Sequence, residues 1–387
     1  MAASEPPGDE TFAGLGCLIM AVRGEEGVAA RVDWKIVRWA AIASYLVVLT
    51  TYLIAVGIPL DRTGLTLWIL VGLSTLVIGK GWRAWWRLML DWLPFQGILL
   101  AYDFGYGMAS HFHGSYAAGF PEQGATNGLG MPLHVTFPIE FDKFLFGGTL
   151  PNQWVQEHFH ATTTVPWISV VVTLCYCSHF VLTPLAATYW WIVARDKFRI
   201  WVKLVIAVAV AGLATYFLYP MSPPWLASMQ DYIPGDVVER LSGQGWQRMG
   251  FHIASQVLGD SQARSNPVAA MPSLHMAYAT LLVGFVWCWT KRWWLRGLLV
   301  LYPLLMAFSL VYAGEHYVTD ELFGVLYAVI IIGAWQLVRR RATRQSRDPD
   351  EPPADAPGTG RTGDEVTDGV SGARLDGAGV RMTEQLD

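Results

Sequence analysis

Long apolar runs separated by polar connections dominate this chain. A helix needs about 20 residues at 1.5 Å rise to cross the hydrocarbon core of a bilayer. The runs therefore predict an all-α fold, a polytopic membrane bundle of about eight transmembrane helices. The second run is short, and its extension through residues 82–86 stays open. The expected spans are 34–58, 64–79, 92–110, 165–193, 200–219, 272–290, 295–313 and 319–338.

The two ends and the longest connection differ from these runs. Residues 344–387 are rich in Gly, Asp, Pro and Thr, so they cannot bury enough apolar surface to offset the entropy of ordering. We expect them, and residues 1–30, to be disordered cytosolic segments that flank a transmembrane domain over residues 31–343. In the connection 111–164, residues 137–146 and the segment after Pro151 are candidates for short interfacial helices, and residues 111–130 are expected to be irregular.

Composition supports a membrane protein. The chain is 53% hydrophobic and 15% charged, whereas soluble domains carry about a quarter charged residues. No cationic stripe suggests a nucleic-acid partner. The four cysteines lack metal-ligand spacing, as do the histidines and carboxylates, so we expect neither a metal nor another cofactor. The expected partners are the bilayer and a membrane lipid substrate, and the oligomeric state stays open.

Basic residues alternate with the predicted spans. Clusters precede the first span and follow spans two, four, six and eight, at residues 31–38, 80–87, 195–203, 291–296 and 339–347. Because basic clusters mark cytosolic connections, both termini are predicted to be cytosolic. The connections 111–164 and 220–271 then face the outside.

Two short motifs lie at the external ends of later spans. Pro272-Ser273-Leu274-His275 opens the sixth span, and His316-Tyr317-Val318-Thr319-Asp320 follows the seventh, so the two histidines are 41 positions apart. That separation fits one passage across the bilayer and one back. Both histidines are therefore predicted at the external face.

These residues suit phosphoryl transfer. Asp320 follows His316 by four positions, which places both side chains on one helical face. The carboxylate would fix the imidazole tautomer, leaving the second ring nitrogen to attack phosphorus. His275 would protonate the leaving oxygen. Free N–H groups at residues 273–276 would favour a phosphate. A phosphohistidine would form and then pass its group to water or an alcohol.

Other polar groups are weaker candidates. Asp103 lies within the third span and His179 within the fourth, where ionisable residues are candidates for function. We predict substrate contacts for Asp103 and for Ser273 and Tyr317 in the motifs, although Asp103 could instead pair with a neighbouring helix. For His179 a helix–helix hydrogen bond is favoured over a catalytic role. The best external cation for a phosphate is Arg264. Weaker candidates are Arg240 and Arg248.

The two motifs together resemble signatures of the type 2 phosphatidic acid phosphatase superfamily. The resemblance is strongest to the branch of inositol phosphorylceramide synthases and their bacterial relatives. It extends over about residues 90–335. It implies a six-helix phosphatase-like core, with His316 as nucleophile, Asp320 as its partner and His275 as the acid on the leaving group. The stretches that carry it are 91–95 through 102–103, 219–225, 266–275 and 311–320.

The chain departs from the superfamily pattern at two places. The superfamily has Ser-Arg seven and six positions before its nucleophilic histidine, where this chain has Ser309 and Leu310. Lys80 and Arg87 match the spacing of the superfamily's first motif, with Leu88 in place of proline. The predicted topology puts them on the cytosolic face, roughly 30 Å from His316. They are therefore interpreted as a cytosolic anchor.

The predicted function is an integral-membrane phosphotransferase of inositolphosphotransferase type, acting on a lipid phosphate or phospholipid headgroup. The alternative is a phosphatase of phosphatidic acid or polyprenyl phosphate. The sequence does not name the acceptor, although the H-Y-x-x-D form favours transfer. A transporter is a distant alternative, because no internal repeat is evident and the polar groups gather at one surface. Tail composition and the bacterial branch favour a bacterial plasma membrane, with a periplasmic site.

Overall fold

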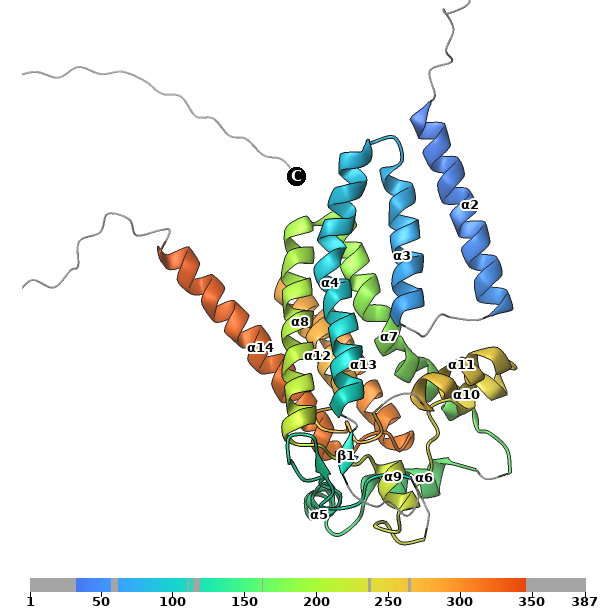
Figure 1. Ribbon diagram of the computed structural model, residues 1–387, viewed down its shortest axis with the longest axis vertical. Coiled ribbons are helices and arrows are strands. Elements are labelled where there is room, and N and C mark those ends of the chain that lie inside the picture. The colour runs from blue at the N-terminus through green and yellow to red at the C-terminus, as the bar shows by residue number, and fades with distance from the viewer. Residues whose placement is uncertain are drawn as a thin grey trace, which may run out of the picture. The chain divides into compact units, whose positions relative to one another are not determined.

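The computed structural model describes residues 33–56, 62–109, 111–113, 119–161, 163–235, 238–263 and 266–345. Eight helices occupy the eight predicted spans (Figure 1). They are α2 (Trp34–Ala55), α3 (Arg62–Val77), α4 (Trp82–Ala109), α7 (Trp167–Val193), α8 (Arg195–Leu218), α12 (Leu274–Trp289), α13 (Trp293–Tyr312) and α14 (Val318–Gln345). The predicted disordered ends lie outside the described residues, apart from the last positions of α14.

The predicted external connections hold most of the shorter elements. These are β1 (Phe112–His113), β2 (Thr126–Asn127), α5 (Thr136–Leu145), α6 (Pro151–Phe159), α9 (Pro224–Met229), α10 (Gln244–Arg248) and α11 (His252–Ala263). The two strands pair antiparallel, with Phe112 opposite Asn127. Helices α5 and α6 lie where short helices were predicted, while the stretch expected to be irregular contains the strands.

The all-α membrane bundle is confirmed. Within the described residues, α2, α7, α8, α13 and most of α14 are long and apolar enough to cross a membrane, and α3 and α12 are shorter apolar helices. The chain is therefore a multi-pass membrane protein. The described residues beyond 337 form the exposed basic end of α14, with Arg339, Arg340 and Arg341.

The third span begins earlier than predicted. Helix α4 starts at Trp82, ten positions before the expected start at 92, and the open segment 82–86 belongs to it rather than to the second span. Gly79 and Gly81 end the preceding helix, because they adopt φ angles of +79° and +81° that other residues rarely adopt. A side chain at Gly79 would also lie 2.5 Å from the Cβ of Trp34 on α2.

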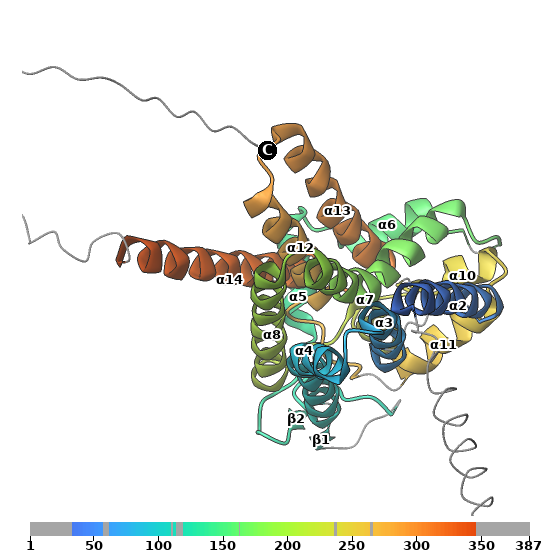
Figure 2. The same ribbon diagram turned by 90° about the horizontal axis from the view of Figure 1, so that it is seen from above.

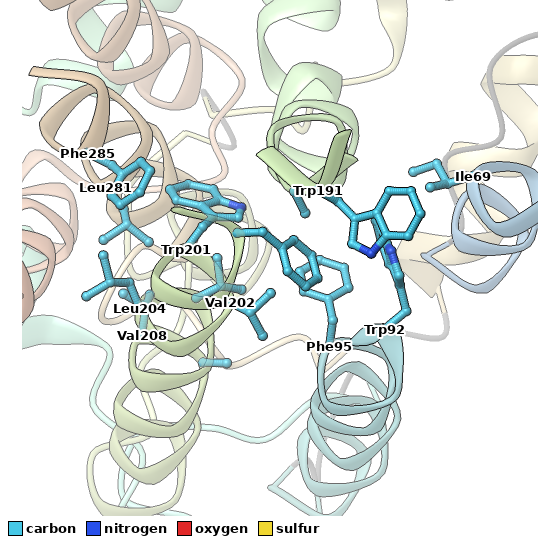
Figure 3. Close-up of a cluster of buried hydrophobic side chains, with 14 of the residues drawn as sticks. Ile69, Trp92, Phe95, Trp191, Trp201, Val202, Leu204, Val208, Leu281 and Phe285 are labelled. Carbon is cyan, nitrogen blue, oxygen red and sulfur yellow. The ribbon is translucent and has the colours of Figure 1, made fainter. Parts of the chain in front are cut away.

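Helices α4, α7, α8 and α12 lie beside one another (Figure 2), and aromatic packing fills the space between them (Figure 3). The Trp201 ring on α8 lies 5.4 Å from the Phe285 ring on α12. Trp92 on α4 packs edge-on against Phe95, with 5.6 Å between ring centroids, and its ring is tilted against that of Phe198 on α8 at 5.8 Å. Lipid tails are as apolar as these side chains, so close van der Waals packing rather than escape from water holds membrane helices together.

An ion pair joins α4 to the first residue of α8, and α8 starts toward the end of the bundle where α3 and α4 connect (Figure 1). Arg195 contacts the carboxylate of Asp91, which also accepts a hydrogen bond from the Trp191 indole at 3.1 Å. The Arg195 guanidinium lies 3.5 Å from the centroid of the Trp191 ring. This end also carries Lys80 and Arg87, whereas α5, α6 and α9 lie at the other end.

Candidate active site

A tight turn places His316 just before α14. Helix α13 ends at Tyr312, and the chain then reverses at Gly314, whose φ is +67°. A Cβ at Gly314 would lie 2.5 Å from the carbonyl oxygen of Glu239, so only glycine fits there. His275 is the second residue of α12. The two imidazole rings lie 5.6 Å apart between centroids.

The carboxylate of Asp320 holds the His316 ring. The Nδ1 atom of His316 lies 2.8 Å from Oδ2 of Asp320, and both side chains are buried. A carboxylate on Nδ1 favours the tautomer that carries its proton there, so Nε2 presents its lone pair. The same carboxylate would stabilise positive charge on the ring. The pair therefore has the geometry of an activated nucleophile.

Helix α7 forms an aromatic wall around His275. Tyr176 stacks on the His275 ring at 4.6 Å, and Phe180 meets its edge at 5.7 Å. His179 lies 4.3 Å away, also between ring centroids. The sequence favoured a helix–helix hydrogen bond for His179 but did not identify His275 as its neighbour. It could not show that α7 and the start of α12 meet at the site.

Backbone contacts join the two motifs. The Ser273 amide donates to the carbonyl oxygen of Asp320 at 3.0 Å. A Cβ at Gly324 would lie 2.4 Å from the Ser273 carbonyl oxygen, so α14 approaches the start of α12 backbone to backbone. The Ser273 hydroxyl caps α12 by accepting from the Met276 amide at 3.3 Å.

This arrangement corrects the phosphate cradle expected at residues 273–276. Two of its four N–H groups, those of Ser273 and Met276, already donate within the protein. Ser273 is also fully buried. The structure thus gives Ser273 a role in joining the motifs, and its contact with substrate stays a prediction.

Two amide side chains on α6 hold the loop that carries His316. The Asn152 amide donates to the carbonyl oxygens of Val311 and His316, both at 2.9 Å. One turn later, Gln156 donates to the carbonyl oxygens of Tyr312 and Glu239, both at 2.8 Å. Both amides are buried. Sequence reasoning missed them, although two amides four positions apart on an amphipathic helix were a detectable signal.

A carboxylate on α5 caps the start of α14. Asp142 accepts hydrogen bonds from the amides of Val318 and Thr319, both at 2.9 Å, and from the Thr319 hydroxyl. Burial raises the pKa of Asp142 above its usual value, and these hydrogen bonds act in the opposite direction. Because the first amides of a helix lack internal partners, this carboxylate fixes the direction of the helix that carries Asp320.

Glu315, the neighbour of His316, organises a second polar network. The Arg240 guanidinium holds its carboxylate through two bonds of 2.9 and 3.0 Å. The Ser242 hydroxyl and the Gln262 amide donate to the same carboxylate at 2.7 and 3.0 Å. Burial works to raise the pKa of Glu315, but the charge and hydrogen bonds of Arg240, the Ser242 hydrogen bond and the nearby His316 together outweigh it, and the pKa is lowered. Arg240, a weaker candidate than Arg264 in the sequence, thus pairs with the residue that precedes His316.

The remaining predicted residues are more distant or are not described. Arg264 lies outside the described residues, as does the side chain of Asp103 on α4. Tyr317 is buried among apolar side chains, and within the described part of the chain its hydroxyl has no hydrogen-bond partner. Burial raises the pKa of Tyr317 well above its usual value. Arg248 donates to the Val165 carbonyl at 2.6 Å, so it supports the start of α7.

An apolar cavity of about 50 Å³ lies beside the site, between α3, α4, α7, α8 and α12. Its lining is mostly aliphatic and aromatic, and includes Leu65, Phe95 and Leu274. His179 and Tyr278 form part of its wall, and His179 contacts His275. An apolar space whose wall includes His179, the neighbour of His275, suits a hydrocarbon chain.

Comparison with known proteins agrees with the motifs. Residues 148–334, which contain both histidine motifs, match the family model of the PAP2 superfamily. Over 220 residues the chain is 25% identical to the phosphoinositol dihydroceramide synthase of Bacteroides thetaiotaomicron. That match covers 51% of this chain and 66% of the relative's length. No solved structure matches the chain. The resemblance inferred from the sequence is confirmed.

Proposed function

Because residues 148–334 belong to the PAP2 superfamily, we propose that this protein is an integral-membrane enzyme that transfers a phosphoryl or substituted phosphoryl group from a lipid. The observation that carries the proposal is the buried His316–Asp320 pair at 2.8 Å, with the His275 ring 5.6 Å from that of His316. The relative's name points to a phosphoinositol group as cargo and a ceramide-type alcohol as acceptor.

The first step forms a phosphohistidine. Nε2 of His316 attacks phosphorus, and the bond from phosphorus to the lipid oxygen breaks. His275 donates its proton to that oxygen, so the lipid leaves as an alcohol. Asp320 stabilises the positive charge that develops on the His316 ring through Nδ1.

The second step reverses the roles. His275, now neutral, takes the proton of the acceptor hydroxyl. The acceptor oxygen attacks phosphorus, the bond from phosphorus to Nε2 breaks, and His316 is restored. An alcohol acceptor gives transfer and water gives hydrolysis. Both steps use the side chains already named, and neither requires a metal ion.

The site faces the outside of a bacterial plasma membrane in this proposal, with both termini in the cytosol. Support comes from the basic clusters, which lie at the connection between α3 and α4, at the start of α8 and between α12 and α13. The histidines lie at the opposite ends of the same helices.

Product analysis tests the function. Purified protein in detergent is incubated with phosphatidic acid, polyprenyl phosphate or phosphatidylinositol, with and without a ceramide. Lipid products are identified by mass and free phosphate is measured. A new phosphoinositol lipid supports transfer, and free phosphate supports the phosphatase alternative. Either activity is expected to vanish in His316→Ala and to persist in His113→Ala, an exposed histidine on β1. Full activity in His316→Ala would refute the mechanism.

A further inference from the structure

The side chain of Lys197, in the first turn of α8, lies over two tryptophan rings. Its Nζ atom is 4.7 Å from the ring centroid of Trp190 on α7 and 4.4 Å from that of Trp289, the last residue of α12. Lys197 is half-buried, whereas Lys203 on the same helix is exposed. The ammonium group is therefore held against the protein by cation–π contacts.

Further aromatic packing fixes these rings. Trp289 lies 6.5 Å from Trp335 on α14, and Trp190 meets the edge of Phe285 on α12 at 5.9 Å, both between ring centroids. Phe285 in turn lies 6.0 Å from Trp335. We call these four rings together with Lys197 the lysine–tryptophan cup. It joins the ends of α7, α8 and α12 to α14.

The charge of Lys197 is not balanced by a carboxylate in the described part of the chain. Its neighbours on α8, Arg195 and Arg199, pair with Asp91 and Asp196. No described carboxylate pairs with Lys197. An ammonium group has three N–H donors, and two ring faces can accept only two of them. At least one donor therefore remains for an oxygen atom of an anion.

The surroundings of the cup add further positive charge. Lys291 and Arg292 follow Trp289 by two and three positions, and both are exposed. Residues 285–296 contain no carboxylate. Because like charges gather beside a partly desolvated ammonium, an anion would bind here more favourably than a neutral group.

The position of the cup favours a lipid over a soluble anion. Ile192 and Val193, at the end of α7, are 55% and 61% exposed, so apolar surface lies beside the charges. Tryptophan rings favour the headgroup depth of a bilayer. Trp289 follows His275 by 14 positions on α12, or about 20 Å along the helix. A lipid at the cup is therefore remote from the catalytic histidines.

We propose that the lysine–tryptophan cup binds the phosphate of an anionic phospholipid of the phosphatidylglycerol type, in the leaflet opposite the one that the catalytic histidines face. Basic pockets between membrane helices are suited to anionic headgroups. This lipid does not react, and it stabilises the ends of the four helices that form the cup. The assignment uses no step of the chemistry proposed for His316, so it stands or falls independently of that function.

Native mass spectrometry of the full chain in detergent measures this binding without turnover. The protein is titrated with phosphatidylglycerol, with phosphatidylcholine of the same acyl chains, and with glycerol 3-phosphate as a soluble phosphate. Lys197→Met keeps the length of the side chain and removes its charge. Lys203→Met is the matched control, since it removes the same charge from an exposed position of α8.

We expect wild-type protein to bind phosphatidylglycerol more tightly than phosphatidylcholine. Lys197→Met should weaken the binding of phosphatidylglycerol by about fivefold, the effect of one lysine near a membrane surface. Its affinity for phosphatidylcholine should not change, and Lys203→Met should behave as wild type. Equal affinities for the two lipids in wild type, an unchanged affinity in Lys197→Met, or an equal loss in Lys203→Met would overturn the proposal. Displacement of the lipid by glycerol 3-phosphate would instead indicate a site for a soluble phosphate.

Thermal unfolding distinguishes a lipid site from a contact that only joins the helices. Phosphatidylglycerol should raise the Tm of the wild type and of Lys203→Met more than that of Lys197→Met. A Tm difference between wild type and Lys197→Met that is the same in both lipids would contradict lipid binding at the cup.

Lys197→Arg keeps the charge and should retain the preference for phosphatidylglycerol, which tests the proposal even where Lys197→Met does not fold. A loss of that preference in folded Lys197→Arg would count against a site for an anion.

Discussion

Asp320 determines which nitrogen of His316 can act. Its carboxylate lies 2.8 Å from Nδ1 and is fully buried, so little solvent competes for that proton. Asparagine at this position would keep the size of the side chain but could turn its NH₂ group toward the ring. That contact would favour the other tautomer, with the proton on Nε2, and would remove the negative charge that stabilises the imidazolium.

Asp320→Asn is therefore expected to lower kcat by about 10²–10⁴-fold. The change should leave the amount of folded protein unaffected, as judged by gel filtration in detergent. Steady-state kinetics on the lipid substrate identified by product analysis provide the measurement. A kcat within twofold of wild type would show that Asp320 does not support the nucleophile.

The role assigned to His275 predicts dependence on the leaving group. A poor leaving alcohol needs a proton from His275, whereas an aryl oxide leaves without one. His275→Ala should thus lower the rate with a natural lipid by about 10²–10⁴-fold and the rate with an aryl phosphate ester far less. Equal losses with both substrates would assign His275 a role other than general acid.

The lowered pKa of Glu315 predicts a pH-dependent contribution to stability. Its folded pKa lies below the ordinary value of 4.5, so its ion pair with Arg240 contributes fully above about pH 4.5 and is lost as the pH falls through the lowered pKa. At pH 7, Glu315→Gln should lower the free energy of unfolding by about 2 kcal/mol.

Thermal unfolding of both proteins across the acid range checks this prediction. The difference in Tm between wild type and Glu315→Gln should shrink as the pH falls below 4.5. A difference that grows on acidification would mean that Glu315 is protonated in the folded protein at neutral pH.

Helices α5 and α6 stabilise the site more than their short lengths suggest. They contribute Asp142, Asn152 and Gln156, which bind backbone groups more than 80 positions away in the sequence. Asn152→Ala should remove the side-chain donor from the carbonyl oxygens of His316 and Val311, and that of Val311 would keep only the Gly314 amide at 3.2 Å. Such a loss costs about 1–3 kcal/mol of stability.

Comparison of Asn152→Ala with Gln153→Ala tests this interpretation. The amide of Gln153 bonds to Glu157 on its own helix, so its loss should have little effect on stability. If Asn152 positions His316, its variant should also lower kcat while the KM for the lipid changes little. Equal stabilities and equal kcat values for the two variants would contradict a positioning role.

The apolar runs predicted the spans because membrane helices must satisfy their backbone hydrogen bonds internally. The predicted start of the third span was wrong by ten positions. Arg83, Arg87 and Asp91 interrupt the apolar pattern there, although the backbone of α4 stays helical. The two histidine motifs could be found because their spacing reflects the topology. Asp142 could not, because its partners come from a segment far away in the sequence, and an isolated polar residue does not reveal that it is buried. For Asn152 the amide spacing with Gln156 was a signal, but it did not identify the distant carbonyl groups that they bind.

For the whole molecule, the charge pattern predicts which end faces outward. Glu157 on α6 and Asp196 at the start of α8 are both exposed and lie at opposite ends of the bundle. In intact cells, a membrane-impermeant maleimide should label Glu157→Cys, and it should label Asp196→Cys only after the membrane is permeabilised. The parent protein controls for its own cysteines. Labelling in the reverse order would place the site in the cytosol.

The central claim is a covalent bond between His316 and phosphorus, and trapping that adduct tests it most directly. The purified enzyme is mixed with its lipid donor, quenched within milliseconds in base, digested and mapped by tandem mass spectrometry. We expect an acid-labile phosphoryl or substituted phosphoryl group on the peptide that contains His316, absent in His316→Ala and retained in His113→Ala. An adduct on another residue, or turnover that persists in His316→Ala, would contradict it.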